Sequence, residues 1–231
     1  MADPAQHPDF PLGGTWCIVV AGGSGRRFGA PKQFEWMGDE RVVDRSVRVA
    51  ASVCDGVVLV LPQDSMGQVI VEHAAVTASG GSTRSASVRQ GLAHVPDDAR
   101  VVLVHDAARP LASPELFQRV VDAVRGGADA VVPVVPVADT IREVHGGVVD
   151  RDRLRAVQTP QGFDAATLRA AHAGDPEGTD DAGLVESMGT GVVLVEGEPT
   201  NLKITGPADL AIAALLAELA DEVPDPADSG T

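Results

Sequence analysis

The chain contains a series of short apolar runs, separated by stretches in which apolar residues recur at helical spacing. The runs do not alternate between apolar and polar residues, a pattern typical of parallel strands that are buried on both faces of a sheet. The predicted strands are 16–20, 57–61, 101–104, 130–135 and 192–195. The predicted helices are 42–53, 66–77, 85–94 and 114–125. This alternation predicts a three-layer α/β fold with a mostly parallel sheet and right-handed crossovers.

One segment interrupts this alternation. Residues 138–150 contain two short β-prone stretches around Gly146-Gly147, a pattern that indicates a β-hairpin. Its apolar residues are Ile141, Val144, Val148 and Val149. Because these side chains would be poorly buried on an isolated ribbon, we expect an arm that reaches a partner subunit rather than a decorative loop.

Size and composition indicate how many domains the chain forms and in which compartment it works. The 231 residues suit one domain, predicted over 15–220, with disordered ends at 1–14 and at the acidic 221–231. No apolar run is long enough to span a membrane, and residues 1–12 lack the features of a signal peptide. Cys17 and Cys54 are flanked by apolar residues and indicate buried free thiols. We therefore expect a cytoplasmic protein.

The distribution of charge favours a small anionic ligand. The formal net charge of −15 at pH 7 argues against nonspecific binding to nucleic acid or membranes. Several cations nevertheless fall in or near loops that follow apolar runs, namely Arg26, Arg27, Lys32, Arg84, Arg89 and Arg109. A locally basic pocket in an acidic protein suits a nucleotide.

Lysine is almost absent from the chain, which has sixteen arginines and two lysines. Lysine is a compact point charge, whereas arginine presents a planar fork, so a position that retained lysine can be one that arginine cannot fill. Lys32 closes a glycine-rich segment, 21–32, where a functional interpretation is favoured. For Lys203, chance retention on the surface remains an equal alternative.

The first predicted strand runs directly into Ala21-Gly22-Gly23-Ser24-Gly25-Arg26-Arg27. Glycines at the carboxyl end of such a strand let backbone N–H groups surround phosphate oxygens. A P-loop would need Lys-Ser/Thr directly after its last glycine, but here the order is Pro31-Lys32-Gln33. A dinucleotide site would need an acidic residue after the next strand, which ends Leu61-Pro62-Gln63. A plain glycine-rich turn would not explain the presence of Arg26, Arg27 and Lys32 in this segment.

This loop resembles that of the 2-C-methyl-D-erythritol 4-phosphate cytidylyltransferases, and further motifs of that family follow in the same order over residues 16–216. They are Gly80-Gly81-Ser82-Thr83-Arg84 with Ser87, Val104-His105-Asp106-Ala107-Ala108-Arg109-Pro110, Ala138-Asp139-Thr140, Thr159-Pro160-Gln161, Thr179-Asp180-Asp181 and Asn201-Leu202-Lys203-Ile204-Thr205. Ser82 and Thr83 stand where the family often has acidic residues. The resemblance implies a Rossmann-like nucleotidyltransferase fold with an inserted dimerisation arm at 138–150.

The resemblance also implies a reaction in which a sugar-alcohol phosphate attacks CTP and pyrophosphate leaves. The nucleophile is a phosphate oxygen that is already ionised, so no general base is needed, and positioning and electrostatics supply most of the catalysis. His105 is therefore interpreted as structural. Asp106 would be the carboxylate on the Mg²⁺ side, since Mg²⁺ typically takes one or two carboxylates plus phosphates and water. The alternative for Asp106 is a helix cap or an ion pair with Arg109.

Residue roles are carried over motif by motif. The implied catalytic residues are Arg27 and Lys32, which would stabilise the α-phosphate and the leaving pyrophosphate, and Lys203 and Arg151, which would hold the acceptor phosphate, with Arg151 coming from the neighbouring subunit. The implied substrate-binding residues are Ala21, Gly22, Gly23, Gly25, Gly81, Ser82, Arg84, Ser87, Asp106, Ala107, Arg109, Thr140, Thr159 and Thr179.

The leading hypothesis is a Mg²⁺-dependent homodimeric cytidylyltransferase that acts on methylerythritol phosphate in isoprenoid precursor synthesis. One alternative is a ribitol 5-phosphate cytidylyltransferase, which shares these loops. Another is a nucleotide-binding module without catalysis, which would bind CTP but release no pyrophosphate.

Overall fold

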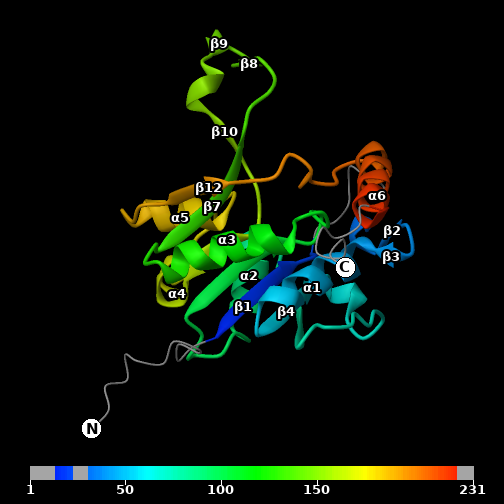
Figure 1. Cartoon of the computed structure of the whole chain (residues 1–231). Helices are drawn as coiled ribbons and strands as arrows, with labels where there is room; N and C mark the ends of the chain where they lie inside the picture. Colours follow the sequence, from blue (N-terminus) through cyan, green and yellow to red (C-terminus); the bar gives the residue numbers. More distant parts are fainter. Residues whose placement is uncertain (1–13, 23–30, 223–231) are drawn as a thin grey trace, which may run out of the picture.

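The structure is a computed structural model that describes residues 14–22 and 31–222. Its centre is an eight-stranded sheet in the order β10-β7-β11-β6-β1-β4-β5, with β12 paired to β7 (Figure 1). The ends predicted to be disordered fall largely outside the described residues, although the last helix continues to Glu222. Gly23, Gly25, Arg26 and Arg27 also lie outside them.

The parallel half of the sheet consists of β6 (Val101–Asp106), β1 (Thr15–Val20), β4 (Gly56–Leu61) and β5 (Val76–Ser79). The other half is mixed. β11 (Gln161–Asp164) runs antiparallel between β6 and β7 (Ala130–Pro136), β10 (Arg155–Val157) is antiparallel to β7, and β12 (Val193–Glu196) is parallel to it. The predicted mostly parallel α/β sheet is confirmed, and β5, β10 and β11 are additions to it.

Helices cover both faces of the sheet, which gives the predicted three layers. On one face, α1 (Val42–Val53) and α3 (Pro114–Arg125) pack on side chains such as Cys17 and Val19. On the other face, α2 (Arg84–Leu92), α4 (Ala165–Ala171) and α5 (Asp181–Ser187) pack on alternate residues such as Ile18. Because successive side chains of a strand point to opposite faces, each buried strand contributes to two cores.

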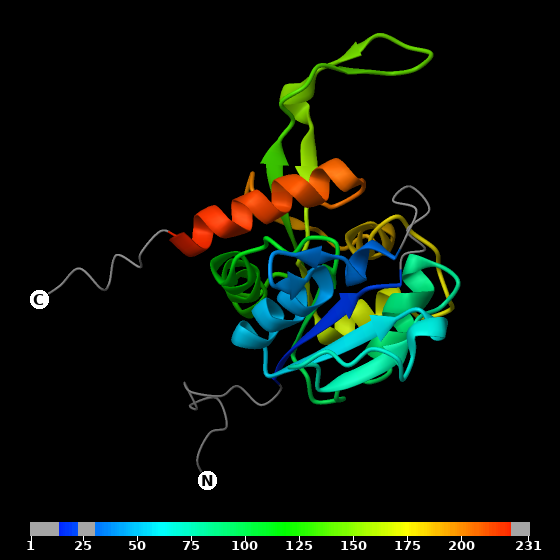
Figure 2. The same ribbon diagram turned by 90° about the vertical axis from the view of Figure 1, so that its right-hand side faces the viewer.

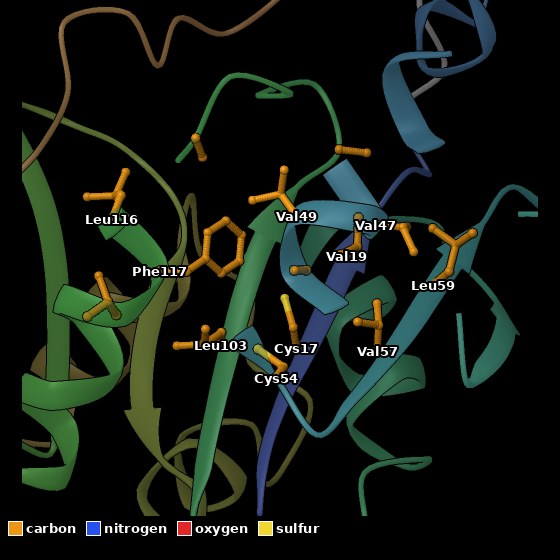
Figure 3. Packing of buried hydrophobic residues seen from close by; sticks show 14 of the residues in the cluster. Cys17, Val19, Val47, Val49, Cys54, Val57, Leu59, Leu103, Leu116 and Phe117 are labelled. Atoms are coloured by element: carbon orange, nitrogen blue, oxygen red, sulfur yellow. The ribbon is translucent and has the colours of Figure 1, made fainter. Parts of the chain in front are cut away.

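Small aliphatic side chains and few aromatic ones fill the core beneath α1 and α3 (Figure 3). Phe117 is among the largest of its fully buried residues. The two cysteines lie side by side in it, and both are free thiols. Burial, with a smaller contribution from Cys54, raises the pKa of the Cys17 thiol well above its usual value. The prediction of buried free thiols is confirmed.

The predicted helix at 66–77 is wrong. After a 3-10 helix, η3 (Gln63–Ser65), the chain passes through turns and then enters β5. Gly67 and His73 both have positive φ angles, of 72° and 65°, which a right-handed helix cannot contain. The β-branched residues between them also disfavour a helix.

The predicted hairpin is confirmed. β8 (Ile141–Arg142) pairs with β9 (Val148–Val149), and a 3-10 helix, η4 (Arg151–Arg153), follows. Both views show this arm, defined as residues 138–153, projecting away from the body of the domain (Figures 1 and 2).

The last helix, α6 (Pro207–Glu222), closes a third, smaller core. It packs Ala213 and Ala217 near Met37, which belongs to a hairpin of β2 (Trp36–Met37) and β3 (Glu40–Arg41) that follows the 3-10 helix η2 (Lys32–Phe34). None of the described helices is long and apolar enough to cross a membrane.

The close approach of α2 to the sheet gives a first testable prediction. A Cβ atom on Gly91 would lie 2.5 Å from Ile18 Cγ2 and 3.0 Å from Val60 Cγ2. We expect Gly91→Ala to lower the free energy of unfolding by about 1 kcal/mol, because overpacking outweighs the helix propensity that alanine gains. Urea denaturation measures this change. The exposed Gln90→Ala on the same helix is the control, and a Gly91→Ala variant as stable as that control would contradict the packing argument.

Candidate active site

The site is built at the carboxyl ends of the parallel strands, where ligands bind in open α/β sheets. Backbone hydrogen bonds fix the loops that leave these strands. Ala21 N donates to Val60 O at 2.8 Å, Gly80 N to Leu61 O at 2.7 Å, and Ala107 N to Val20 O at 3.0 Å. The predicted residues Ala21 and Ala107 are therefore anchored at the carboxyl ends of the strands. Gly22 and Gly81 directly follow the anchored residues Ala21 and Gly80.

Ser87 connects two of these loops. Its hydroxyl donates to Thr83 O at 2.8 Å and accepts from Gly81 N at 3.2 Å. A Cβ atom on Gly22 would lie 3.4 Å from the same oxygen, so the glycine-rich loop begins against Ser87. A Cβ atom on Gly81 would lie 2.4 Å from that of Ala86, which makes glycine necessary there for packing alone. Ser82, between these residues, is exposed.

Asp106, the last residue of β6, is the centre of a group of ion pairs. Lys203 Nζ lies 2.6 Å from Oδ2, and Arg84 Nε lies 3.4 Å from Oδ1. Burial alone would raise the pKa of Asp106, but the charges of Arg84 and Lys203 hold it well below its usual value. Asp106 is thus an ionised, almost buried carboxylate.

Arg84 has a second and closer partner. Its Nη1 lies 2.7 Å from Asp181 Oδ2, and Asp181 Oδ1 lies 2.9 Å from His172 Nε2. Burial lowers the pKa of Arg84, but the two carboxylates outweigh this effect and raise it. The resulting network, His172–Asp181–Arg84–Asp106–Lys203, is called the Asp106 network below.

Arg109 does not form the ion pair that the sequence offered as an alternative for Asp106. Its guanidinium donates to Asn201 O at 2.8 Å and to Val157 O at 3.1 Å. Burial lowers its pKa, and the charge of Asp106 acts in the opposite direction. Arg109 therefore ties the β6 loop to the segment that precedes Lys203.

The two lysines converge on one segment. Lys32 Nζ donates to Ile204 O at 2.5 Å, and Lys203 is the residue before Ile204. Ile204 N in turn donates to Ala108 O at 2.8 Å, which fixes the segment beside the β6 loop. The two positions that kept lysine are thus brought together although they are far apart in sequence.

Thr159 and His105 are buried next to Asp106 and form a chain of contacts with its backbone. Thr159 Oγ1 accepts from Asp106 N at 3.0 Å and lies 3.1 Å from His105 Nδ1, and both side chains are buried. The His105 ring packs on Phe117, with ring centroids 5.0 Å apart. The structural interpretation of His105 fits this position.

Three further predicted residues are not members of the Asp106 network. Thr140 is exposed at the base of the arm, and Thr179 is exposed just before α5. Arg151 lies in η4 of the arm, where its Nη1 donates to Ala138 O at 2.5 Å. Gly23, Gly25 and Arg27 fall outside the described residues.

The donor set of the site fits one magnesium ion held mainly by its substrate. The described residues contain no group of three or more acidic, histidine or cysteine side chains that could hold a metal by themselves. Asp106 offers a single ionised carboxylate, and within residues 14–22 and 31–222 the contact of its Oδ1 is the long one to Arg84. Mg²⁺ commonly binds through one or two carboxylates plus substrate phosphates and water, and Asp106 could serve in that way.

The fold and site together define a Rossmann-like nucleotidyltransferase domain. Comparison with known proteins identifies the family, because the profile described as 2-C-methyl-D-erythritol 4-phosphate cytidylyltransferase matches residues 15–218. The chain belongs to this family.

Individual relatives agree with this assignment. A 2-C-methyl-D-erythritol 4-phosphate cytidylyltransferase of Rhodococcus opacus is 48% identical over 214 residues, covering 87% of this chain and 94% of the relative. One from Saccharopolyspora erythraea is also 48% identical, covering 85% and 96%. The crystal structure of the enzyme from Thermus thermophilus aligns with a TM-score of 0.78 at 38% identity, covering 90% of this chain and all of that one.

The sequence did not identify Asp181 and His172 as parts of the site. Asp181 belongs to the family-like motif Thr179-Asp180-Asp181. The motif drew attention to this residue, but the sequence did not reveal that it pairs with Arg84. No sequence signal points to His172, which follows α4 and reaches Asp181 through the fold.

Burial of His105 gives a prediction about pH. Burial lowers its pKa to about 4, whereas an exposed histidine titrates near 6.5. The unfolded chain therefore binds more protons between these values, so His105 makes the fold less stable as the pH falls through this window. Lowering the pH from 7 to 5 should cost wild type about 2 kcal/mol more than His105→Gln, as measured by urea unfolding. Equal losses in the two proteins would show that His105 becomes protonated in the fold.

Proposed function

We propose that the protein transfers a cytidylyl group from CTP to 2-C-methyl-D-erythritol 4-phosphate and releases pyrophosphate. The observation that carries this proposal is the convergence of Lys32 and Lys203 on one segment beside Asp106. Two compact cations at the edge of a nucleotide-binding sheet suit a reaction in which two anionic phosphates must approach each other. The names of the relatives give the nucleotide and the acceptor.

The site residues act through charge and position. The attacking phosphate oxygen is ionised at neutral pH, so no residue has to remove a proton from it. Lys32 would stabilise charge that develops around the α-phosphorus, where a preorganised cation contributes most. Lys203, half-exposed beside Asp106, is placed to meet the acceptor phosphate. Mg²⁺, when bound with the nucleotide at Asp106, would supply further neutralisation of phosphate charge.

The proposed enzyme is a homodimer with composite sites. The arm projects from its own domain and carries exposed apolar residues such as Val144 and Val148, which favours a partner of the same kind (Figure 2). Arg151 lies at the base of this arm. We propose that it grips the acceptor phosphate in the neighbouring subunit. The same proposal places the enzyme in the cytoplasm, without a nucleic-acid or membrane partner.

The substrate assignment is tested by measuring pyrophosphate release. Each of the four ribonucleoside triphosphates is combined with either methylerythritol 4-phosphate or ribitol 5-phosphate in the presence of Mg²⁺. We expect release only with CTP and methylerythritol phosphate, because a site that pairs with cytosine rejects a base with inverted donors and acceptors. Release with ribitol phosphate instead would favour the other branch, and CTP binding without release would indicate a binding module.

The composite site predicts rescue between inactive subunits. A Lys32→Ala chain is mixed with an Arg151→Ala chain and the subunits are allowed to exchange. In a mixed dimer one site carries both defects and the other carries none. Random pairing makes about half of the dimers mixed, and one of the two sites in each mixed dimer is intact. About a quarter of wild-type activity should therefore return. If Arg151 served its own chain, every site would carry a defect, and no rescue would be seen once exchange had been verified.

A further inference from the structure

Two members of the Asp106 network, Asp181 and His172, have no role in the proposed reaction. Asp181 is fully buried at the start of α5, and the His172 side chain behind it is almost fully buried. A buried carboxylate needs partners, because an isolated buried charge is strongly unfavourable. Asp181 has two partners, His172 on Oδ1 and Arg84 on Oδ2.

Arg84 is shared unequally between two carboxylates. It lies 2.7 Å from Asp181 but 3.4 Å from Asp106. Attraction between charges grows as distance shortens and as water is excluded, and both factors favour Asp181. The guanidinium is therefore held toward Asp181, and its contact with Oδ1 of Asp106 is the weaker of the two.

Further contacts fix this geometry. Arg89 Nη1 donates to Pro176 O at 2.7 Å, and Arg89 Nη2 lies 3.1 Å from Glu177 Oε1. Ser85 and Gly178 exchange hydrogen bonds, since Gly178 N donates to Ser85 Oγ at 3.1 Å and Ser85 Oγ donates to Gly178 O at 3.2 Å. The loop before α5 is thus fastened to the beginning of α2. This places Asp181 and Arg84 relative to each other independently of their own ion pair.

We propose that Asp181 is a positioning residue that, supported by His172, holds Arg84 back and keeps Oδ1 of Asp106 open to the divalent cation that accompanies the nucleotide. Without the charge of Asp181, Arg84 would close on Asp106 and compete with the metal. This inference rests on the proposed function, because it takes Asp106 as the carboxylate of a metal–nucleotide site.

The test measures metal binding rather than turnover. Mn²⁺ is titrated into the full-length protein with a saturating non-hydrolysable CTP analogue, and free Mn²⁺ is followed by electron paramagnetic resonance. Asp181→Asn keeps the size and a hydrogen-bonding oxygen but removes the charge. We expect Mn²⁺ to bind about tenfold more weakly, in the range of couplings seen within one ion-pair network.

Asp180→Asn is the matched control, because it removes the same charge from the adjacent residue. Asp180 caps α5 and accepts from Gln161, and no ion pair with Arg84 is among its contacts. Asparagine is also a good N-cap, so Mn²⁺ affinity should stay within about twofold of wild type. A loss as large as that of Asp181→Asn would show a general charge effect and overturn the proposal.

A double-mutant cycle tests whether Asp181 affects metal binding through Arg84. Arg84→Gln removes the competing cation and serves as the reference for the cycle, because Arg84 is also an implied nucleotide-binding residue. Adding Asp181→Asn to Arg84→Gln should cause no further loss of Mn²⁺ affinity. An equal loss with and without Arg84 would overturn the proposal. If Asp181→Asn alone does not fold, as judged by circular dichroism, the double variant, which removes both charges of the Arg84–Asp181 pair, is compared with Arg84→Gln. A tenfold loss of Mn²⁺ affinity between these two would contradict competition.

The outcomes also separate this inference from the function on which it rests. If wild type binds no Mn²⁺ beside the analogue, the metal site at Asp106 fails and this inference fails with it. If wild type binds Mn²⁺ and Asp181→Asn binds it equally well, only the positioning role is overturned.

Discussion

The almost buried charge of Asp106 is the constraint on which the rest of the site depends. It sits at the end of a fully buried strand, where burial would raise its pKa, and it stays ionised because Arg84 and Lys203 surround it. These cations come from different parts of the chain, the start of α2 and the segment before α6. Leaving such a carboxylate without partners would cost several kcal/mol, so folding has to bring these elements together.

This arrangement explains how an acidic protein can offer a site to anions. The chain carries a formal charge of −15, yet both of its lysines meet beside the carboxyl ends of the parallel strands. Asp106 cancels part of this positive charge, and in our proposal it offers a carboxylate for a metal that arrives with a nucleotide. The Asp106 network therefore pairs a nearly buried carboxylate with two cations, and Lys203 stays half-exposed, where we propose that it meets phosphate.

Sequence reasoning succeeded where local signals were strong. The continuous apolar runs predicted β1, β4 and β6. The helical spacing of apolar residues predicted a helix at 114–125, the bounds of α3, whose first turn is capped by Ser113 accepting from Leu116 N. It missed β10 and β11, which are short, and it placed a helix across positive φ angles. The site loops were recognised by resemblance, but the pairing of Arg84 with Asp181 joins residues 97 apart, and no local pattern encodes such a contact.

The central claim is that Asp106 and the two lysines form the nucleotide site. A crystal structure of the protein with a non-hydrolysable CTP analogue and Mn²⁺ tests it most directly, because the anomalous signal locates the metal. The account predicts a metal peak at Asp106 Oδ1, the triphosphate against Lys32, and Arg84 still paired with Asp181. A nucleotide bound elsewhere, with Asp106 remote from both metal and phosphate, would contradict it.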